Sequence, residues 1–358
     1  MHLNKWPDTR LTKLLGITHP IIQAPMAGFA TVELVAAVSN AGGLGSLGCG
    51  EMTADELVSH VTALRKVTDK PFNLNFMAHD SPVFDQELDA NTRNRLEKFS
   101  GPHSNPFSAD TKSSPFGEFN EEILSTLLEL EPGIVSFHFG LPRREWVAEL
   151  KSRGTLILST ATSVDEARLL ADEGVDAVIA QGWEAGGHRG SIDVNLEDHG
   201  VGTLALVPQI VDAVSVPVIA AGGIADGRGI AAAFMLGASG VQCGTAFLSC
   251  PESGADAPYR SALAGAKDSD TRLSRAFSGR PARARNNAYM AFMAEHRDAL
   301  PDYPTMYNFS MPLVDDPEVS GADIYFYGQC AALNRILPAS ELVDLLVAEA
   351  LVLLNPGG

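Results

Sequence analysis

Short runs of apolar residues alternate with amphipathic helical patterns along most of the chain, from about residue 20 to about residue 250. A strand-length apolar run followed by a helical pattern, repeated many times, is typical of a parallel sheet covered by helices. Eight runs have the length and composition of buried strands. We predict strands at residues 20–24, 43–47, 71–75, 134–138, 155–159, 177–181, 216–220 and 240–244.

The segments between the predicted strands carry signals for helix starts and ends. Thr53 and Ser163 each stand three residues before a glutamate and directly before an apolar helical pattern, which is the spacing of a capping box. Gly42 and Gly174 stand where helices should end, and Thr203 is the expected N-cap of a further helix. Eight such strand and helix units predict an α/β fold, a (β/α)8 TIM barrel, with functional side chains at the carboxyl ends of the strands.

Two regions interrupt this alternation. Residues 79–119 are polar and contain several prolines and serines, so they predict a long loop after the third strand that forms a lid or rim. Beyond residue 250 the strand rhythm is lost, and a basic stretch at residues 272–285 precedes a helical pattern at residues 286–296.

The second interruption predicts the domain organisation. We expect residues 1–250 and 325–358 to form the barrel, with an apolar terminal helix at residues 340–354 returning to the barrel wall. Residues 251–324 are expected to form a smaller, mostly helical substrate cap.

Composition narrows the classes of function. The 358 residues are 45% hydrophobic, enough for a large core, and the formal net charge is -18. Such a charge repels phosphate backbones and anionic lipids, so we expect a small-molecule ligand and neither a nucleic-acid nor a membrane partner. The four cysteines are far apart without a CxxC pair, which predicts reduced thiols and no metal site. Without a secretory or membrane-length apolar segment, the protein is expected to be cytoplasmic, as a monomer or a homodimer.

A histidine embedded in glycines follows the predicted sixth strand. His188 lies in the segment Gln-Gly-Trp-Glu-Ala-Gly-Gly-His-Arg-Gly at residues 181–190. A base on glycine-rich backbone at the mouth of a buried strand is a common arrangement in enzyme sites. His138 ends the predicted fourth strand and so faces the same mouth. A lone strand histidine is more often a hydrogen-bonded core residue, but two at one mouth favour chemistry.

Two consecutive predicted strands end in glycines. Gly222 and Gly223 follow the seventh strand, and Gly244 and Thr245 end the eighth. Backbone of this kind next to helix starts forms the phosphate sites that many barrels have after strands seven and eight. The glycines would also suit tight turns alone, but their equivalent positions in the two strands favour a phosphate site. The phosphate of a mononucleotide such as FMN fits it.

Amides and a soft apolar side chain complete the predicted mouth of the barrel. Met26 follows the first strand, while Asn75 and Gln181 end the third and the sixth. Amides there can hydrogen-bond the polar edge of a flavin, although core packing is the alternative for Met26. A GxGxxG pattern at residues 43–48 is rejected as a dinucleotide site, because a helical pattern precedes it and no helix opens on its glycines.

With these motifs, the chain resembles the nitronate monooxygenases, formerly called 2-nitropropane dioxygenases, and in particular their class I branch of bacteria and fungi. The segments that carry the resemblance are residues 23–28, 71–76, 135–140, 181–190, 221–224, 277–283 and 327–329. The resemblance implies an FMN-containing TIM barrel with a substrate cap and no metal. The chain departs from the family pattern around Tyr303, and it has Tyr327 where the family has a tryptophan.

The resemblance also implies roles for particular residues. His188 matches the family's catalytic histidine, and His138 matches the class I active-site histidine, which also borders the substrate. The positions implied to bind FMN are Ala24, Pro25, Met26, Asn75, Gln181, Gly186, Gly187, Gly222, Gly223, Gly244 and Thr245. The tyrosines implied to border the substrate are Tyr303, Tyr307, Tyr325 and Tyr327.

The implied reaction is the FMN-dependent oxidation of an alkyl nitronate by O2 to a carbonyl compound and nitrite, with propionate 3-nitronate as one candidate substrate. His188 would stabilise the anion or remove the α-proton of a neutral nitroalkane, and Arg189 is a further positive partner. FMN-dependent NAD(P)H:quinone or enoyl reductases share much of this motif set and are the alternative. A flavin-binding protein without turnover is the third hypothesis, and the paired histidines argue against it.

Overall fold

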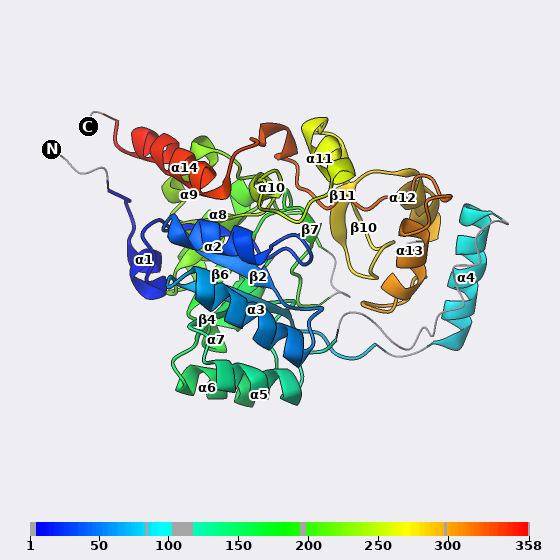
Figure 1. The fold of residues 1–358 in the computed structure, drawn as a ribbon, viewed down its shortest axis with the longest axis horizontal. Coiled ribbons are helices and arrows are strands. Elements are labelled where there is room, and N and C mark those ends of the chain that lie inside the picture. The colour runs from blue at the N-terminus through cyan, green and yellow to red at the C-terminus, as the bar shows by residue number, and fades with distance from the viewer. Residues whose placement is uncertain (1–4, 83–84, 102–116, 194–197, 297–298, 357–358) are drawn as a thin grey trace.

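The centre of the protein, described here by a computed structural model of residues 5–82, 85–101, 117–193, 198–296 and 299–356, is a cylinder of eight parallel strands (Figure 1). Their order is β1-β9-β8-β6-β5-β4-β3-β2, and a bridge between Ile22 and Leu44 brings β2 back to β1. All eight predicted strands are confirmed, and the fold is a TIM barrel. The strands are β1 (Ile21–Gln23), β2 (Gly45–Gly48), β3 (Phe72–Met77), β4 (Ile134–His138), β5 (Leu156–Ala161), β6 (Ala177–Gln181), β8 (Val218–Ala221) and β9 (Gly240–Cys243).

Helices cover the outside of this cylinder (Figure 1). The capping boxes predicted at Thr53 and Ser163 are present at the starts of their helices. Gly42 and Gly174 follow helix ends with φ of 87° and 84°, a conformation that glycine adopts without strain. The covering helices are α2 (Val32–Asn40), α3 (Ala54–Val67), α5 (Glu121–Leu130), α6 (Arg144–Ser152), α7 (Val164–Asp172), α8 (Thr203–Ala213), α9 (Gly227–Met235) and α14 (Ala339–Leu354).

The N-cap predicted at Thr203 is wrong. The N-cap of α8 is Gly202, and Thr203 is the first helical residue. The carboxylate of Glu184, from the loop after β6, accepts hydrogen bonds from the backbone N and the Oγ1 of Thr203, both at 2.9 Å. A carboxylate from another segment therefore satisfies the helix start, which a local capping pattern does not reveal.

The barrel strands are buried on both faces. Ile22, Leu44 and Ile179 belong to an inner apolar cluster together with Leu11 and Leu15 of α1 (Arg10–Leu15). Side chains at alternate strand positions belong instead to the larger cluster between the strands and the helices. Burial on both faces explains why these strands read as continuous apolar runs. Because α1 fills one end of the barrel interior, the other end is left for ligands.

The cap contains a small antiparallel sheet that was not predicted. β10 (Thr271–Ser274) pairs with β11 (Ala282–Arg285), which in turn pairs with β7 (Gly187–His188). The arginine-rich sequence concealed this hairpin because Arg283 is buried, whereas arginine normally marks an exposed position. The remaining cap elements include α11 (Ala257–Ala264), α12 (Ala288–Met293) and α13 (Tyr307–Val314).

Part of the predicted loop at residues 79–119 is a helix that packs on the cap. α4 (Gln86–Ser100) lies beside α13 (Figure 1), and its Leu96 shares an apolar cluster with Phe277 and Phe309. The Arg95 side chain donates a hydrogen bond to the carbonyl oxygen of Ala299 at 2.7 Å. The proline-rich and serine-rich stretches that indicated a lid fall at residues 102–116, outside the described residues.

The cysteines form no disulfide among the described residues. All four cysteines are buried free thiols, and burial raises the pKa of Cys49 to about 12 and that of Cys330 to about 11. These thiols are therefore protonated at neutral pH.

Among the helices in the described part of the chain, none combines the length and the apolar character that crossing a bilayer requires.

Candidate active site

A cavity of about 510 Å³ lies at the carboxyl ends of the barrel strands, between the barrel and the cap. Its volume is in the usual range for small-molecule sites. His138, His188 and Tyr307 all line it. So does every position that was expected to bind the cofactor, namely Ala24, Pro25, Met26, Asn75, Gln181, Gly186, Gly187, Gly222, Gly223, Gly244 and Thr245. The structure therefore brings residues from strand ends far apart in sequence to one cavity.

His188 stands where the barrel and the cap meet. It belongs to β7, and its Cα pairs with Ala282 of the cap hairpin, so the hairpin holds its backbone. Its Nε2 lies 2.9 Å from the Oγ of Ser278 and 3.5 Å from the hydroxyl of Tyr307. The Ser278 hydroxyl donates to the carbonyl oxygen of Arg280 at 3.1 Å, so its oxygen is free to accept the Nε2 proton of His188. In the neutral ring this leaves a lone pair on Nδ1.

His138 lies next to the backbone of His188. Its Nε2 is 3.2 Å from the carbonyl oxygen of His188, and its Nδ1 is 3.1 Å from the Oγ1 of Thr160. A carbonyl oxygen only accepts, so Nε2 carries the proton and Nδ1 accepts from the threonine hydroxyl. The His138 ring therefore holds the main chain of His188 in place as well as lining the cavity.

Both imidazoles are neutral at physiological pH. Burial lowers the pKa of His138 to about 4. Burial, together with the neighbouring His138 and Arg280, lowers the pKa of His188 to about 3. The charged form of a histidine loses hydration when it is enclosed by protein, and nearby positive groups disfavour it further. His188 is therefore a base with an available lone pair, as a proton acceptor in an active site must be.

Two buried arginines hold the loop that carries His188. Arg189 donates to the carbonyl oxygens of Gln181 and Gly182 at 3.0 and 2.9 Å and pairs with Asp198 at 2.8 Å. Arg283 donates to the carbonyl oxygen of Trp183 at 2.7 Å. The expectation that Arg189 offers its charge to a substrate is therefore wrong, because its guanidinium is turned into the protein and does not line the cavity.

The glycine corner has backbone that only glycine fits well. Gly222 and Gly223 have φ of 104° and 73°. A Cβ on Gly222 would lie 3.1 Å from both the backbone N of Ala185 and the carbonyl oxygen of Gly182, closer than ordinary contacts. Gly244 is the N-cap of the short helix α10 (Thr245–Leu248), whose first N–H groups have no acceptor within the helix. The corner is therefore packed closely against the protein on one side, and it presents bare backbone and the donors of a helix start to the cavity.

The amides at the strand ends divide into two kinds. The Gln181 side chain donates to the carbonyl oxygen of His188 at 2.9 Å and accepts from the backbone N of Gly190 at 2.8 Å, so it is used within the protein. Asn75 donates to Ser136. Gln242, which the sequence analysis did not single out, lines the cavity, and its Oε1 is buried without a hydrogen-bond partner among the described residues. Gln242 lies two residues before Gly244, so the two share one face of the chain at β9, and this spacing could have assigned Gln242 to the cavity from the sequence.

The four predicted substrate tyrosines take different places. Tyr307 lines the cavity, and the Tyr303 ring packs against the His188 ring with centroids 5.6 Å apart. Tyr325 and Tyr327 do not contribute to the lining, whereas Phe326 between them does.

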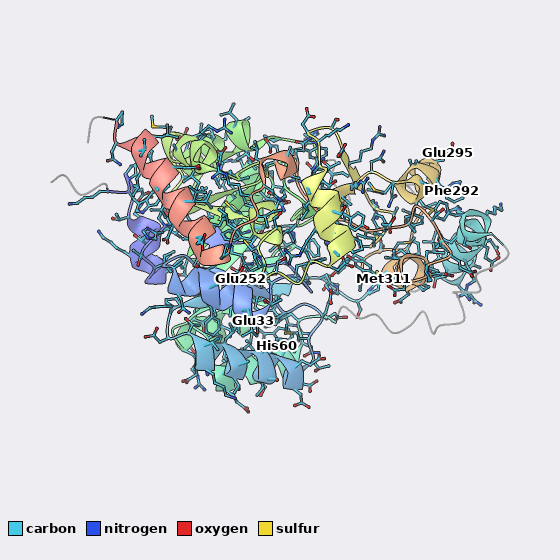
Figure 2. All side chains as sticks on the ribbon, turned by 45° about the horizontal axis from the view of Figure 1, so that its top comes forward. Glu33, His60, Glu252, Phe292, Glu295 and Met311 are labelled. Carbon is cyan, nitrogen blue, oxygen red and sulfur yellow. The ribbon has the colours of Figure 1, made fainter. Side chains whose placement is uncertain are left out.

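Several lining residues were missed by the sequence analysis. They come from cap segments and loops whose contacts no local pattern reveals. Figure 2 marks one of them, Met311, on α13 in the cap, away from Glu33 and His60 on the barrel helices. The missed residues include Glu51, Met77, Tyr259, Met311, Val314, Ile324 and Phe326.

Comparison with known sequences gives a consistent result over the whole chain. A family model described as nitronate monooxygenase matches residues 8–349. A nitronate monooxygenase of Paraburkholderia phytofirmans is 44% identical over 348 residues, covering 95% of this chain and 94% of the relative. One of Pseudomonas aeruginosa is 44% identical over 353 residues, covering 95% and 98%.

Comparison with solved structures agrees. A nitroalkane oxidase from Streptomyces ansochromogenes superposes with a TM-score of 0.86 at 39% identity, covering 96% of this chain and 98% of the other. FabK from Thermotoga maritima superposes with a TM-score of 0.73 at 32% identity, covering 97% and 96%.

Proposed function

The chain belongs to the nitronate monooxygenase family, and we propose that it is an FMN-dependent enzyme that oxidises alkyl nitronates with O2 to carbonyl compounds and nitrite. The single observation that carries the proposal is a neutral imidazole, that of His188, lining an enclosed cavity between barrel and cap. In this reaction two nitronates and one O2 give two carbonyl compounds and two nitrite ions: each C=N bond breaks, its nitrogen leaves as nitrite, and one oxygen atom of O2 enters each carbonyl group.

The residues of the glycine corner fit FMN. Gly222, Gly223 and Gly244 present backbone without side chains to the cavity, and the first N–H groups of α10 can donate to the oxygens of a phosphate group there. The unpartnered Oε1 of Gln242 can accept from an N–H of a flavin ring, and Met26 offers a soft apolar surface to that ring. When bound there, the flavin would supply the electron acceptor for the oxidation.

His188 would act at the α-carbon and at the nitro group. For a neutral nitroalkane, Nδ1 would accept the α-proton. A nitronate has already lost that proton, and its negative charge raises the pKa of an imidazole that it contacts. We therefore expect His188 to take up a proton when a nitronate binds, and then to donate a hydrogen bond to a nitro-group oxygen. The hydroxyl of Tyr307, which lies 3.5 Å from the Nε2 of His188 and lines the cavity, can donate a second hydrogen bond to the nitro group.

Oxygen consumption by the purified protein tests the proposal. We expect a yellow protein that releases FMN on denaturation and consumes O2 when given ethyl nitronate, with nitrite and acetaldehyde formed in equal amounts. A colourless protein that cannot be loaded with FMN, or a yellow protein that leaves ethyl nitronate unchanged, would contradict it.

A reductase is the second candidate, because FMN-dependent NAD(P)H:quinone or enoyl reductases share much of the motif set of this chain. Anaerobic mixing with NADH distinguishes the two. Rapid bleaching of the flavin by NADH, without any response to a nitronate, would select the reductase. We expect slow or no bleaching by NADH and rapid bleaching by ethyl nitronate.

A further inference from the structure

The cap wall of the cavity is apolar. Tyr307, Met311 and Val314 are spaced i, i+4 and i+7 on α13, so they share one face of the helix, and all three line the cavity. Ile324 and Phe326 continue this wall. Apart from the phenol hydroxyl, these side chains offer no hydrogen-bonding group to a ligand. A hydrocarbon substituent that extends from the reacting carbon toward α13 would therefore be buried against apolar surface.

The described residues that line the cavity include neither lysine nor arginine. The nearest cations are engaged elsewhere. Arg280 donates to the carbonyl oxygen of Ser191 at 2.7 Å and lies 4.0 Å from the ring centroid of Phe139. Arg189 pairs with Asp198. The charge of Arg280 acts on both histidines from outside the lining, so a second anionic group on a substrate would find no cationic side chain to pair with in the described wall.

A carboxylate lies at the rim instead. Glu51, in the turn after β2, lines the cavity while keeping part of its surface in solvent. It makes no ion pair among the described residues, and its negative charge acts on the phenols of Tyr303 and Tyr307. Partial burial raises the pKa of Glu51. Like charges repel across such a partly enclosed space more strongly than in bulk water.

We infer that the enzyme selects nitronates with uncharged hydrocarbon substituents and discriminates against nitronates that carry a carboxylate, such as propionate 3-nitronate. The inference rests on the proposed function and names the substrate class of the same site. Glu51 is the specificity residue at the rim, and Met311 and Val314 are the surface that the hydrocarbon contacts.

Paired substrates of similar length test this directly. We expect kcat/KM to rise from ethyl to butyl nitronate and to be at least tenfold higher for butyl nitronate than for propionate 3-nitronate. Binding to the His188→Ala variant, which lacks the proton acceptor, provides a readout with little turnover. Calorimetric titration should give a lower Kd for 1-nitrobutane than for 3-nitropropionate.

Substitution of Glu51 tests the rim charge. E51Q should shift the ratio of kcat/KM for propionate 3-nitronate to that for butyl nitronate at least threefold in favour of the carboxylated substrate. Asp55→Asn is the matched control, because Asp55 is an exposed carboxylate in the first turn of α3 that does not line the cavity. The control should leave the ratio unchanged.

The two failures are distinguishable. Equal or faster turnover of propionate 3-nitronate by the unmodified enzyme, or an E51Q ratio no different from that of D55N, would overturn the inference and leave nitronate oxidation standing. Absence of turnover with every nitronate would overturn the proposed function itself.

Discussion

The barrel wall and the cap wall of the cavity are built in different ways. The barrel wall consists largely of strand ends and glycines, such as Gly222 and Gly244, whose backbone forms the surface. The cap wall consists of side chains, such as Tyr307, Met311 and Val314. A wall of backbone tolerates few substitutions, whereas a wall of side chains changes shape and charge with each one. We infer that the barrel wall determines the cofactor and that the cap wall determines the substrate.

His188 joins the two walls. It follows β6 of the barrel along the chain, yet its backbone is paired with β11 of the cap. The cap hairpin thus places the imidazole relative to the glycine-lined barrel wall. The following predictions separate the contributions of the two walls, beginning with the residue that they share.

Removal of the shared imidazole should have the largest effect. We expect His188→Ala to lower kcat/KM for nitroethane by roughly 10²–10⁴-fold, because the proton acceptor is lost, while the flavin absorbance is retained. The control is His60→Ala on α3, which Figure 2 places on the outside of the barrel, and it should have no effect. Steady-state oxygen consumption measures both, and an undiminished rate would remove His188 from the chemistry.

Removal of a buried arginine on the cap side should affect folding. Arg283→Met leaves the carbonyl oxygen of Trp183 without its two donors, so we expect the free energy of unfolding to fall by roughly 2–4 kcal/mol. Arg272→Met, on the paired strand β10, removes an exposed arginine. It should change the free energy of unfolding by less than about 0.5 kcal/mol. Urea unfolding compares the two, and equal losses would mean that Arg283 does not hold the loop.

A methyl group in the glycine corner should affect the barrel wall alone. Gly222→Ala combines positive φ with close contacts. We therefore expect the free energy of unfolding to fall by roughly 1–3 kcal/mol and the FMN Kd to rise about tenfold. Gly174→Ala has similar strain, with φ of 84°, but no atom within 4 Å of the added Cβ. It should lower stability without changing the FMN Kd. Titration of the two apoproteins with FMN measures both Kd values. Equal Kd values for the two variants would contradict the assignment of the phosphate site to the glycine corner.

Acid should weaken the protein through the two cavity histidines. Their pKa values of about 3 and 4 lie below the unfolded value of about 6.5, so between these values the unfolded state binds more protons and stability falls as the pH decreases. From pH 7 to pH 5 we expect each histidine to contribute roughly 1–2 kcal/mol to this loss. The urea midpoint should therefore fall less between pH 7 and pH 5 in a variant that carries both His138→Gln and His188→Gln. The same fall in the variant and the unmodified protein would contradict the lowered pKa values of the two histidines.

The barrel could be predicted because its information is local. Each strand is a continuous apolar run, since both faces are buried, and capping boxes such as that at Thr53 act within a single turn. Strand ends of a parallel barrel necessarily meet at one mouth, so Met26, Asn75 and Gly222 could be assigned to one site from their positions alone.

The cap could not be predicted in the same way because its stability comes from contacts between distant segments. The hairpin β10–β11 is arginine-rich. Arg283 can be buried in its strand because its guanidinium donates a hydrogen bond to the carbonyl oxygen of Trp183. The same reason explains the missed N-cap at α8, where Glu184 comes from another loop.

The sequence by itself determined the barrel, the strand ends and the glycine-rich part of the cavity lining, because apolar periodicity and glycine positions constrain the backbone directly. Only the tertiary structure decided that Arg189 is turned into the protein, that Gln242 and Glu51 face the cavity, and that Phe326 lines it in place of its two tyrosine neighbours. These outcomes depend on which distant groups supply hydrogen bonds and apolar contacts, and such long-range pairings leave no periodic pattern in the chain.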